Sequence, residues 1–228
     1  MAVLWSVTEP EPRRRRSLPI LIALVALLLT VAAAVLIHFY RQSQIIPPLY
    51  SPDTVITRDR PILAPPSLTV EEAQRWAEAR RADPLFIELA PMFWELATAE
   101  GVDPAIAYAQ AALETDRLRF GGIIDASYHN VCGLKTAEGG DDRDPAAHQR
   151  FPDWETGIRA QIEHLALYAG APGYPLEDPA DPRHFAWLHG SGRTISELGR
   201  SWASAGHYGE ALGRIVEEML AGTRRDTR

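Results

Sequence analysis

The chain has 228 residues, of which 46% are hydrophobic and 23% charged, and its formal net charge is −7. This length leaves room for one medium-sized domain plus further segments, and the composition is ordinary for a protein that buries a core. Because residues 1–50 contain five arginines and two glutamates, the remainder carries a formal charge of −10, which argues against nucleic acid as a partner.

An uncharged apolar run, Leu18–Ile37, lies near the N-terminus. It is long enough to cross a bilayer as a helix, which takes about 20 residues. Four arginines at 13–16 precede the run, so the positive-inside rule places residues 1–17 in the cytoplasm, a transmembrane helix at 18–40 and the rest outside. A cleaved signal peptide is the alternative, since Ala32–Ala34 offers small residues, but the apolar run continues beyond them and favours an uncleaved anchor.

Residues 41–68 are rich in proline and show no helical period, which predicts an extended linker outside the membrane. Signals for helix starts then recur: Thr69 with Glu72, Asp83-Pro84, Asp103-Pro104, Asp153, Thr194 with Glu197, and a last helix from about His207. Pro91 predicts a kink or break, and the helix that begins at Pro104 is expected to stop near Gly121-Gly122.

The helical period is lost between Val131 and Phe151. Val131–Lys135 and His148–Phe151 have the length of short strands, and the turn-rich segment 138–142 joins them. The predicted fold class is therefore α+β and mainly helical, with a small β-hairpin lobe and one preceding transmembrane helix. The folded domain is expected over 69–222, followed by a tail at 223–228.

Glu114 is the most informative acidic residue of the chain. It lies toward the C-terminal end of the predicted helix, on the edge of the buried face, with Gln110 one turn before it. The negative end of the helix dipole and partial burial both raise the pKa of a carboxyl group, as a glycosidase acid requires. Arg117 and Arg119 would oppose this shift if they pointed inward, and a solvated helical glutamate is the simpler alternative.

Three segments of the chain carry a family resemblance. An Ala/Gln-rich helix ends in Glu114-Thr115, an Asn-led segment reads Asn130–Lys135, and an aromatic-led Gly-Ile helix reads Phe151–Ile158. Together with Trp202-Ala203-Ser204, Tyr208-Gly209 and Ile215, they resemble, in order, the glucosaminidase domain of bacterial cell-wall hydrolases and autolysins, glycoside hydrolase family 73. The resemblance covers roughly residues 83–221.

This resemblance implies a lysozyme-like fold and hydrolysis of the β-1,4 bond after N-acetylglucosamine in peptidoglycan. Glu114 would be the general acid. The side chains predicted to contact substrate are Gln110, Tyr128, Asn130, Trp154 and Tyr208. For Asn130 a turn-capping role, and for Tyr208 plain core packing, remain open alternatives.

A second catalytic carboxylate is harder to identify. The candidates are Asp125, Glu138, Asp141 and Asp142, of which Glu138 is the first choice because it follows the strand after Lys135. An acetamido-assisted route would need no second carboxylate. The chain also departs from the family, which commonly has Gly-Trp-Gly after the acid, where this sequence has Asp116–Gly122.

No cofactor or metal site is expected. The acidic turn at 141–144 lacks the ligand spacing of a calcium loop, and no Cys or third His completes a zinc site with His129 and His148. Cys132, the only cysteine, is expected to be a buried small side chain. The sequence thus predicts a single-pass, membrane-anchored peptidoglycan hydrolase with an extracytoplasmic catalytic domain. A lytic transglycosylase or muramidase on the same scaffold and a non-catalytic wall-binding module are the alternatives.

Overall fold

The computed structural model describes residues 59–202 and 207–226. The predicted cytoplasmic segment, the transmembrane helix at 18–40 and the linker up to residue 58 lie outside the described residues. Among the helices that are described, none is long and apolar enough to span a membrane.

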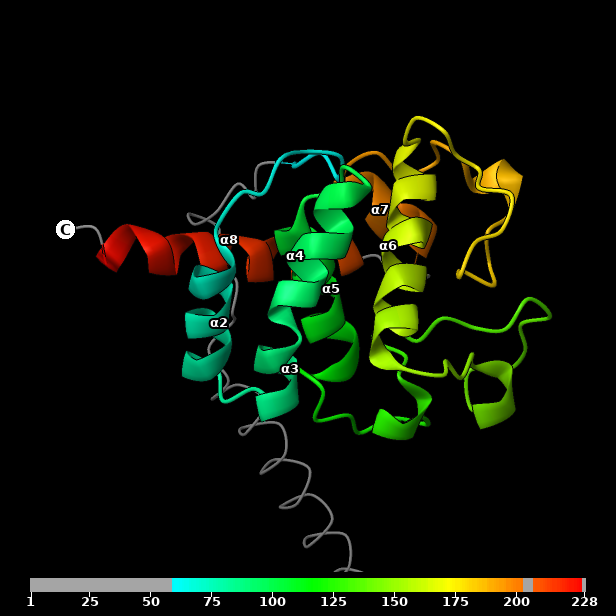
Figure 1. Cartoon of the computed structure of the whole chain (residues 1–228), viewed down its shortest axis with the longest axis horizontal. Coiled ribbons are helices and arrows are strands. Elements are labelled where there is room, and N and C mark those ends of the chain that lie inside the picture. Colours follow the sequence, from blue (N-terminus) through cyan, green and yellow to red (C-terminus); the bar gives the residue numbers. More distant parts are fainter. Residues whose placement is uncertain (1–58, 203–206, 227–228) are drawn as a thin grey trace, which may run out of the picture. The chain divides into compact units, whose positions relative to one another are not determined.

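Helices make up most of the described structure (Figure 1), with α2, α4, α5 and α6 side by side and α8 running across α2 and α5. The α-helices are α2 (Val70–Ala79), α3 (Pro84–Glu88), α4 (Ala90–Ala99), α5 (Pro104–Thr115), α6 (Trp154–Ala169), α7 (Ile195–Trp202) and α8 (Tyr208–Asp226). Three short 3-10 helices lie in the connections: η1 (Ala126–Tyr128), η2 (Pro145–Ala147) and η3 (Ala186–Leu188).

Local sequence signals account for the helix starts. Thr69 and Glu72 form the predicted capping box of α2, with each side chain accepting a hydrogen bond from the other's backbone. The carboxylates of Asp83, Asp103 and Asp153 cap α3, α5 and α6 as predicted. The predicted break at Pro91 is confirmed, because α3 ends at Glu88 and α4 begins at Ala90.

Helix α5 lies in the core of the domain and contacts α4, α6 and α8. Every residue from Pro104 to Ala112 is buried, and its alanines let the neighbouring helices approach closely. Tyr108 is the large exception: its ring stacks on Phe86 with 4.1 Å between centroids, and its hydroxyl donates to the Phe86 carbonyl. Only the C-terminal end of α5 reaches the surface, and Glu114 lies there.

The prediction of two paired strands in a β-hairpin lobe is wrong. Over the described residues, Val131–Lys135 and His148–Phe151 form no named strand and share one isolated bridge, Lys135 with His148. Two backbone hydrogen bonds, Thr136 N to Ala147 O and Gln149 N to Leu134 O, join the segments. The ladder stops there because the first segment turns around the Asn130 side chain, which binds the backbone of Cys132 and Leu134.

The proline-rich segment also differs from the extended linker that was predicted. Ile62 is fully buried and Leu68 is 6% exposed. Pro61 and Leu63 form bridges with Thr194 and Val102. The last residues of the predicted linker therefore belong to the folded domain.

The start of α8 is held close to α5 and α7. A side chain at Gly199 of α7 would come within 2.6 Å of the Gly209 backbone nitrogen, so the two helices cross at a contact that only glycine allows. Helix α8 begins at Tyr208, near the predicted start at His207, and continues to Asp226, beyond the predicted domain end at 222. The crossing brings Tyr208 beside α5.

Candidate active site

An open cleft with a volume of about 420 Å³ lies at the C-terminal end of α5. One wall comes from the end of α5 and the residues that follow it, and the other from the segment between Asn130 and His148. The lining residues are Leu113, Glu114, Thr115, Asp116, Phe120, Gly121, Gly122, Ile123, Ile124, Asn130, Gly133, Asp142 and His148.

Glu114 is the acidic residue that α5 presents to this cleft. Its Oε1 atom accepts two hydrogen bonds, from the Tyr208 hydroxyl at 2.6 Å and from the Trp202 indole nitrogen at 3.1 Å. Within the described residues no hydrogen bond reaches Oε2. The two oxygens of the carboxyl group are therefore inequivalent, with Oε1 held by the protein and Oε2 left for another partner.

The surroundings of Glu114 favour its protonated form. The side chain is open to the cleft, but dense protein around the cleft floor desolvates the carboxyl and raises its pKa above the usual value for glutamate. The hydrogen bonds from Tyr208 and Trp202 lower the pKa, without cancelling the effect of burial. Arg117 and Arg119 do not oppose the shift, because both bind Asp116 instead.

The hydrogen-bond chain at Glu114 continues into the core. Tyr208 accepts a hydrogen bond from Gln110 Nε2 at 3.0 Å, and Gln110 Oε1 accepts one from Gln161 Nε2 at 2.8 Å. Gln110 is 0% exposed, so it lies beneath the cleft surface. It does not line the cleft where a substrate would bind, contrary to the predicted contact.

The rim after Glu114 is the segment that departs from the family pattern. Asp116, Arg117, Leu118 and Phe120 all have positive φ, between 48° and 61°, a conformation that ordinary residues adopt at a cost. This is why α5 ends at Thr115 and not near Gly121-Gly122 as predicted.

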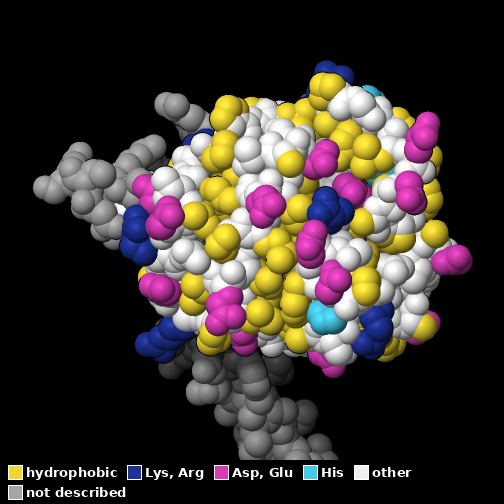
Figure 2. Space-filling view, in the orientation of Figure 1, with side chains coloured by type: hydrophobic (Ala, Val, Ile, Leu, Met, Phe, Trp, Pro, Cys, Tyr) yellow, Lys and Arg dark blue, Asp and Glu magenta, His cyan; other side chains and the backbone are white. Residues whose placement is uncertain are grey.

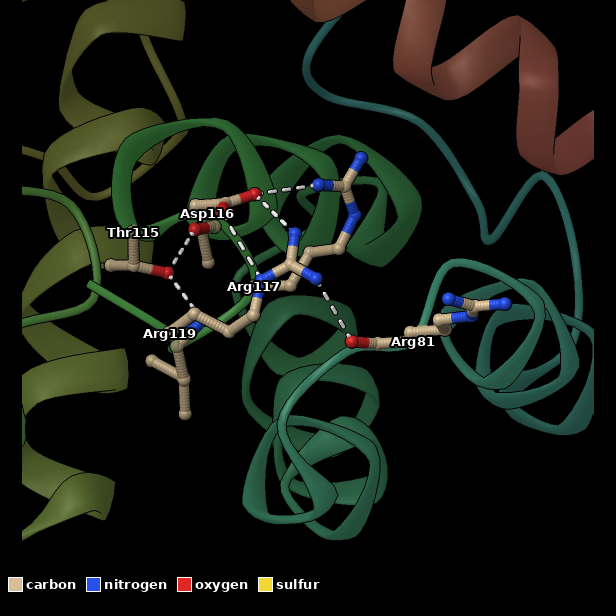
Figure 3. A network of polar contacts seen from close by, with 7 residues as sticks. Arg81, Thr115, Asp116, Arg117 and Arg119 are labelled. Carbon is tan, nitrogen blue, oxygen red and sulfur yellow. Dashed lines mark hydrogen bonds and ion pairs between the residues drawn. The ribbon is translucent and has the colours of Figure 1, made fainter. Parts of the chain in front are cut away.

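Hydrogen bonds hold this rim in place (Figure 3). The Asp116 carboxylate binds Arg117 and Arg119, and Arg119 also donates to the Arg81 carbonyl at 3.1 Å. Thr115 Oγ1 accepts from the Leu118 backbone nitrogen at 2.9 Å. The strained turn is thus fixed by its own side chains, and it shapes one wall of the cleft.

Asn130 is buried, lines the cleft and braces the opposite wall. Its Nδ2 donates to the carbonyls of Leu134 and Gln149, and its Oδ1 accepts from the backbone nitrogens of Cys132 and Leu134. These bonds occupy both ends of the amide, so the structure favours the turn-bracing alternative for this residue.

Tyr128 and Trp154 stand outside the residues that line the cleft. The Arg150 guanidinium lies over the Tyr128 ring, 4.0 Å from its centroid. Trp154 packs edge-on against His129 at the start of α6, with 5.0 Å between ring centroids. Trp154 thus contacts the residue that precedes Asn130, whereas Tyr128 contacts Arg150.

Asp142, not Glu138, is the carboxylate that the second wall brings to the cleft. It forms an ion pair with Lys135, which lowers the pKa of the Asp142 carboxyl. Glu138 is exposed in the preceding turn and does not line the cleft, in contrast to its prediction as the second catalytic residue.

Cys132 is buried, and burial raises the pKa of its thiol. Over residues 59–202 and 207–226, no group of three or more His, Cys, Asp or Glu side chains is placed to hold a metal ion.

Trp202 and Gln161 are the site residues that sequence reasoning missed. Trp202 lies in a segment that resembles the family, but no local sequence pattern links its indole to Glu114. Gln161 is fully buried in α6, where an amide requires a partner, but the sequence alone does not show that burial.

Comparisons with known proteins identify relatives of the part of the chain that contains the cleft. Residues 90–221 match the glucosaminidase family model, described as mannosyl-glycoprotein endo-beta-N-acetylglucosaminidase. An uncharacterized protein of Borreliella burgdorferi is 35% identical over 121 residues, which is 53% of this chain and 56% of that protein. The chain thus spans little more than half the length of this relative.

Among solved structures, the catalytic domain of the autolysin Auto from Listeria monocytogenes aligns with 69% of this chain and 98% of its own. The identity is 16% and the TM-score 0.40. The family match extends from α4 into α8, and so contains Glu114 and the groups that bind it.

Proposed function

This chain belongs to the glucosaminidase family, and we propose that it is a peptidoglycan hydrolase that cleaves the β-1,4 bond after N-acetylglucosamine. One observation carries the assignment of its acid: the Glu114 carboxyl faces the cleft with a raised pKa and with both protein donors on one oxygen. Such a group can bring a proton to a glycosidic oxygen.

The two donors on Oε1 determine which atom carries the proton. An oxygen that accepts from Tyr208 and Trp202 serves as the carbonyl oxygen of a protonated carboxyl group, so the proton belongs on Oε2. Glu114 transfers this proton to the leaving oxygen while the bond from that oxygen to the anomeric carbon breaks. Glu114 is then a carboxylate, which Tyr208 and Trp202 stabilise.

The anomeric carbon is attacked either by water or by the acetamido oxygen of the substrate, and water then opens the resulting ring in the second case. For direct attack by water, we propose Asp142 as the group that takes the water proton, in place of Glu138. Asp142 lines the cleft, and its ion pair with Lys135 keeps it ionised.

We also propose that the catalytic domain works outside the cell, on peptidoglycan, and is tethered by the apolar segment at 18–40. The supporting observations are the uncharged run itself and the four arginines that precede it.

The central experiment replaces the acid with its amide, in Glu114→Gln. Because general acid catalysis contributes about 10²- to 10⁴-fold, we expect release of muropeptides from purified peptidoglycan to fall at least about 100-fold. Binding of the full-length chain to the same peptidoglycan should persist. Glu95→Gln, at an exposed position of α4, is the matched control and should keep wild-type activity.

Mass spectrometry of the products identifies the reaction. New reducing ends on N-acetylglucosamine support the proposal, whereas reducing N-acetylmuramic acid would indicate a muramidase and 1,6-anhydromuramic ends a lytic transglycosylase. If wild-type protein binds peptidoglycan and releases nothing, the chain is a wall-binding module and the enzymatic proposal is wrong.

A further inference from the structure

We propose that two buried glutamines, Gln110 and Gln161, are positioning residues that fix the direction of the hydrogen-bond chain ending on Glu114. The proposal rests on the proposed role of Glu114 as the acid, and it assigns to these glutamines a task other than substrate contact. They act through Tyr208, and neither of them lines the cleft.

The direction of the chain begins at a backbone carbonyl. Gln161 Nε2 donates to the Ala107 carbonyl at 3.0 Å and to Gln110 Oε1 at 2.8 Å. A carbonyl oxygen can only accept, so the nitrogen end of the Gln161 amide has to face Ala107. A flipped Gln161 would place its oxygen against two acceptors.

Gln161 keeps this orientation although its own oxygen gains nothing from it. Gln161 Oε1 is buried and has no hydrogen-bond partner among the described residues. A buried carbonyl without a partner is unfavourable, so stability alone does not explain a glutamine here. Its two donated hydrogen bonds do explain it, because the one to the Ala107 carbonyl orients Gln161 and the one to Gln110 Oε1 orients the next link.

Gln110 passes the direction on to Tyr208. With Oε1 committed to Gln161, its Nε2 faces the Tyr208 hydroxyl at 3.0 Å and donates to it. The Tyr208 oxygen is then an acceptor, and its hydrogen is directed to Glu114 Oε1 at 2.6 Å. Donors linked in this way polarise one another, so each link strengthens the bond to Glu114.

Without Gln161 the hydrogen-bond chain that ends on Glu114 loses its direction. A free Gln110 amide can rotate and offer Oε1 to the Tyr208 hydroxyl, which then has a second acceptor in competition with Glu114. The Glu114 carboxylate would be less stabilised, and the proton would leave Oε2 at higher pH. Packing of the core would change little, since methionine can fill the space of glutamine.

The test measures the ionisation of Glu114 without any need for catalysis. The indole N–H of Trp202 donates to Glu114 Oε1, so its NMR signal in the full-length chain with ¹⁵N-labelled tryptophan reports that ionisation as pH changes. Trp202→Phe assigns the signal. Glu114→Gln removes the transition and so identifies its source.

Four proteins are compared: wild type, Tyr208→Phe, Gln161→Met and Gln74→Met. Loss of one hydrogen bond to a charged group raises the pKa of Glu114 by about one unit in Tyr208→Phe. Gln161→Met should raise it in the same direction by a measurable part of that shift. Gln74→Met is the matched control, because Gln74 also donates to a backbone carbonyl, that of Ile87, but has no connection with Glu114.

An unchanged pKa in folded Gln161→Met, together with a raised pKa in Tyr208→Phe, would overturn the proposal. If Gln161→Met does not fold, Gln110→Met interrupts the same chain one link nearer to Glu114 and is read in the same way. A shift of the pKa in proteins that release no muropeptides supports the positioning role while it contradicts the proposed function.

Discussion

At Glu114 two opposing influences act on one carboxyl group. Desolvation by the surrounding protein favours the neutral acid, and the donors Tyr208 and Trp202 favour the anion. An acid catalyst needs both forms, because it begins protonated and ends charged. Since the protonated form delivers the proton, activity should decline as pH rises through the raised pKa of Glu114.

Asp142 offers a test of the second wall. We expect Asp142→Asn to lower the rate of peptidoglycan hydrolysis at least about 100-fold if this carboxylate takes a proton from water. Glu138→Gln should have a much smaller effect, because Glu138 does not line the cleft. Product release is measured under identical conditions for both variants.

The neighbouring Asp141 supplies the control for this comparison. Asp141 is exposed and does not line the cleft, so Asp141→Asn removes one charge from the same turn and should leave the rate within about two-fold of wild type, as surface changes usually do. Full activity in Asp142→Asn would contradict the role of Asp142 and favour attack by the acetamido group of the substrate.

Glu114 could be predicted as a site residue because its signal is local: it is a carboxylate near the end of a helix that the sequence predicts to be buried. Gln161 and Trp202 lie on α6 and α7, far from Glu114 along the chain. The packing of α5 against α6 and α8, and of α8 against α7, brings these groups together. The prediction favours Glu138 over Asp142 because Glu138 follows the expected strand after Lys135, and over the described residues that segment forms no named strand.

Among the helices, α6 positions the second wall of the cleft through a glycine. An added Cβ at Gly157 would lie 1.8 Å from the carbonyl oxygen of His129, so the backbone before Asn130 rests directly on the helix. The His129 ring also contacts Trp154 in the first turn of α6. The Asn130 segment therefore takes its place from a contact that no larger residue permits.

Gly157→Ala should weaken this contact. Alanine is favoured over glycine inside a helix by about 1 kcal/mol, but the clash here is with backbone, which cannot rotate away. We expect the free energy of unfolding to fall by about 1–3 kcal/mol, the usual effect of overpacking. Denaturant unfolding measures it.

Gly222→Ala provides the comparison, since nothing lies within 4 Å of a Cβ at that exposed position of α8. It should be neutral or slightly stabilising. Equal stability of Gly157→Ala and wild type would show that the Asn130 segment does not rest on α6 as described.

The starts of the helices were predictable because a capping side chain or a proline affects only the backbone within a few residues of it, as at Asp83-Pro84 and Asp103-Pro104. The end of α5 was not, since Asp116 stops the helix in a left-handed conformation that is more typical of glycine. Contacts with Arg117 and Arg119 stabilise it, and their geometry depends on the tertiary fold.

Over the whole molecule, charge is divided along the sequence. The arginines at 13–16 precede the apolar run, whereas residues after 50 carry a formal charge of −10. Figure 2 shows acidic side chains scattered over one face of the described domain, with basic side chains standing apart from one another. This division fits a chain with a basic end kept in the cytoplasm and an acidic domain exported across the membrane.

The last prediction concerns the segment at 18–40. The full-length chain should sediment with membranes and resist alkaline extraction, because a helix of about 20 apolar residues inserts stably. Removal of 18–40 should release the chain into the soluble fraction. External protease should digest the domain in intact spheroplasts, because the proposed topology, based on the four arginines before the apolar run, places the domain outside. N-terminal sequencing separates the alternatives: a mature chain that begins just after Ala34 would show a cleaved signal peptide, and the anchor would then be wrong.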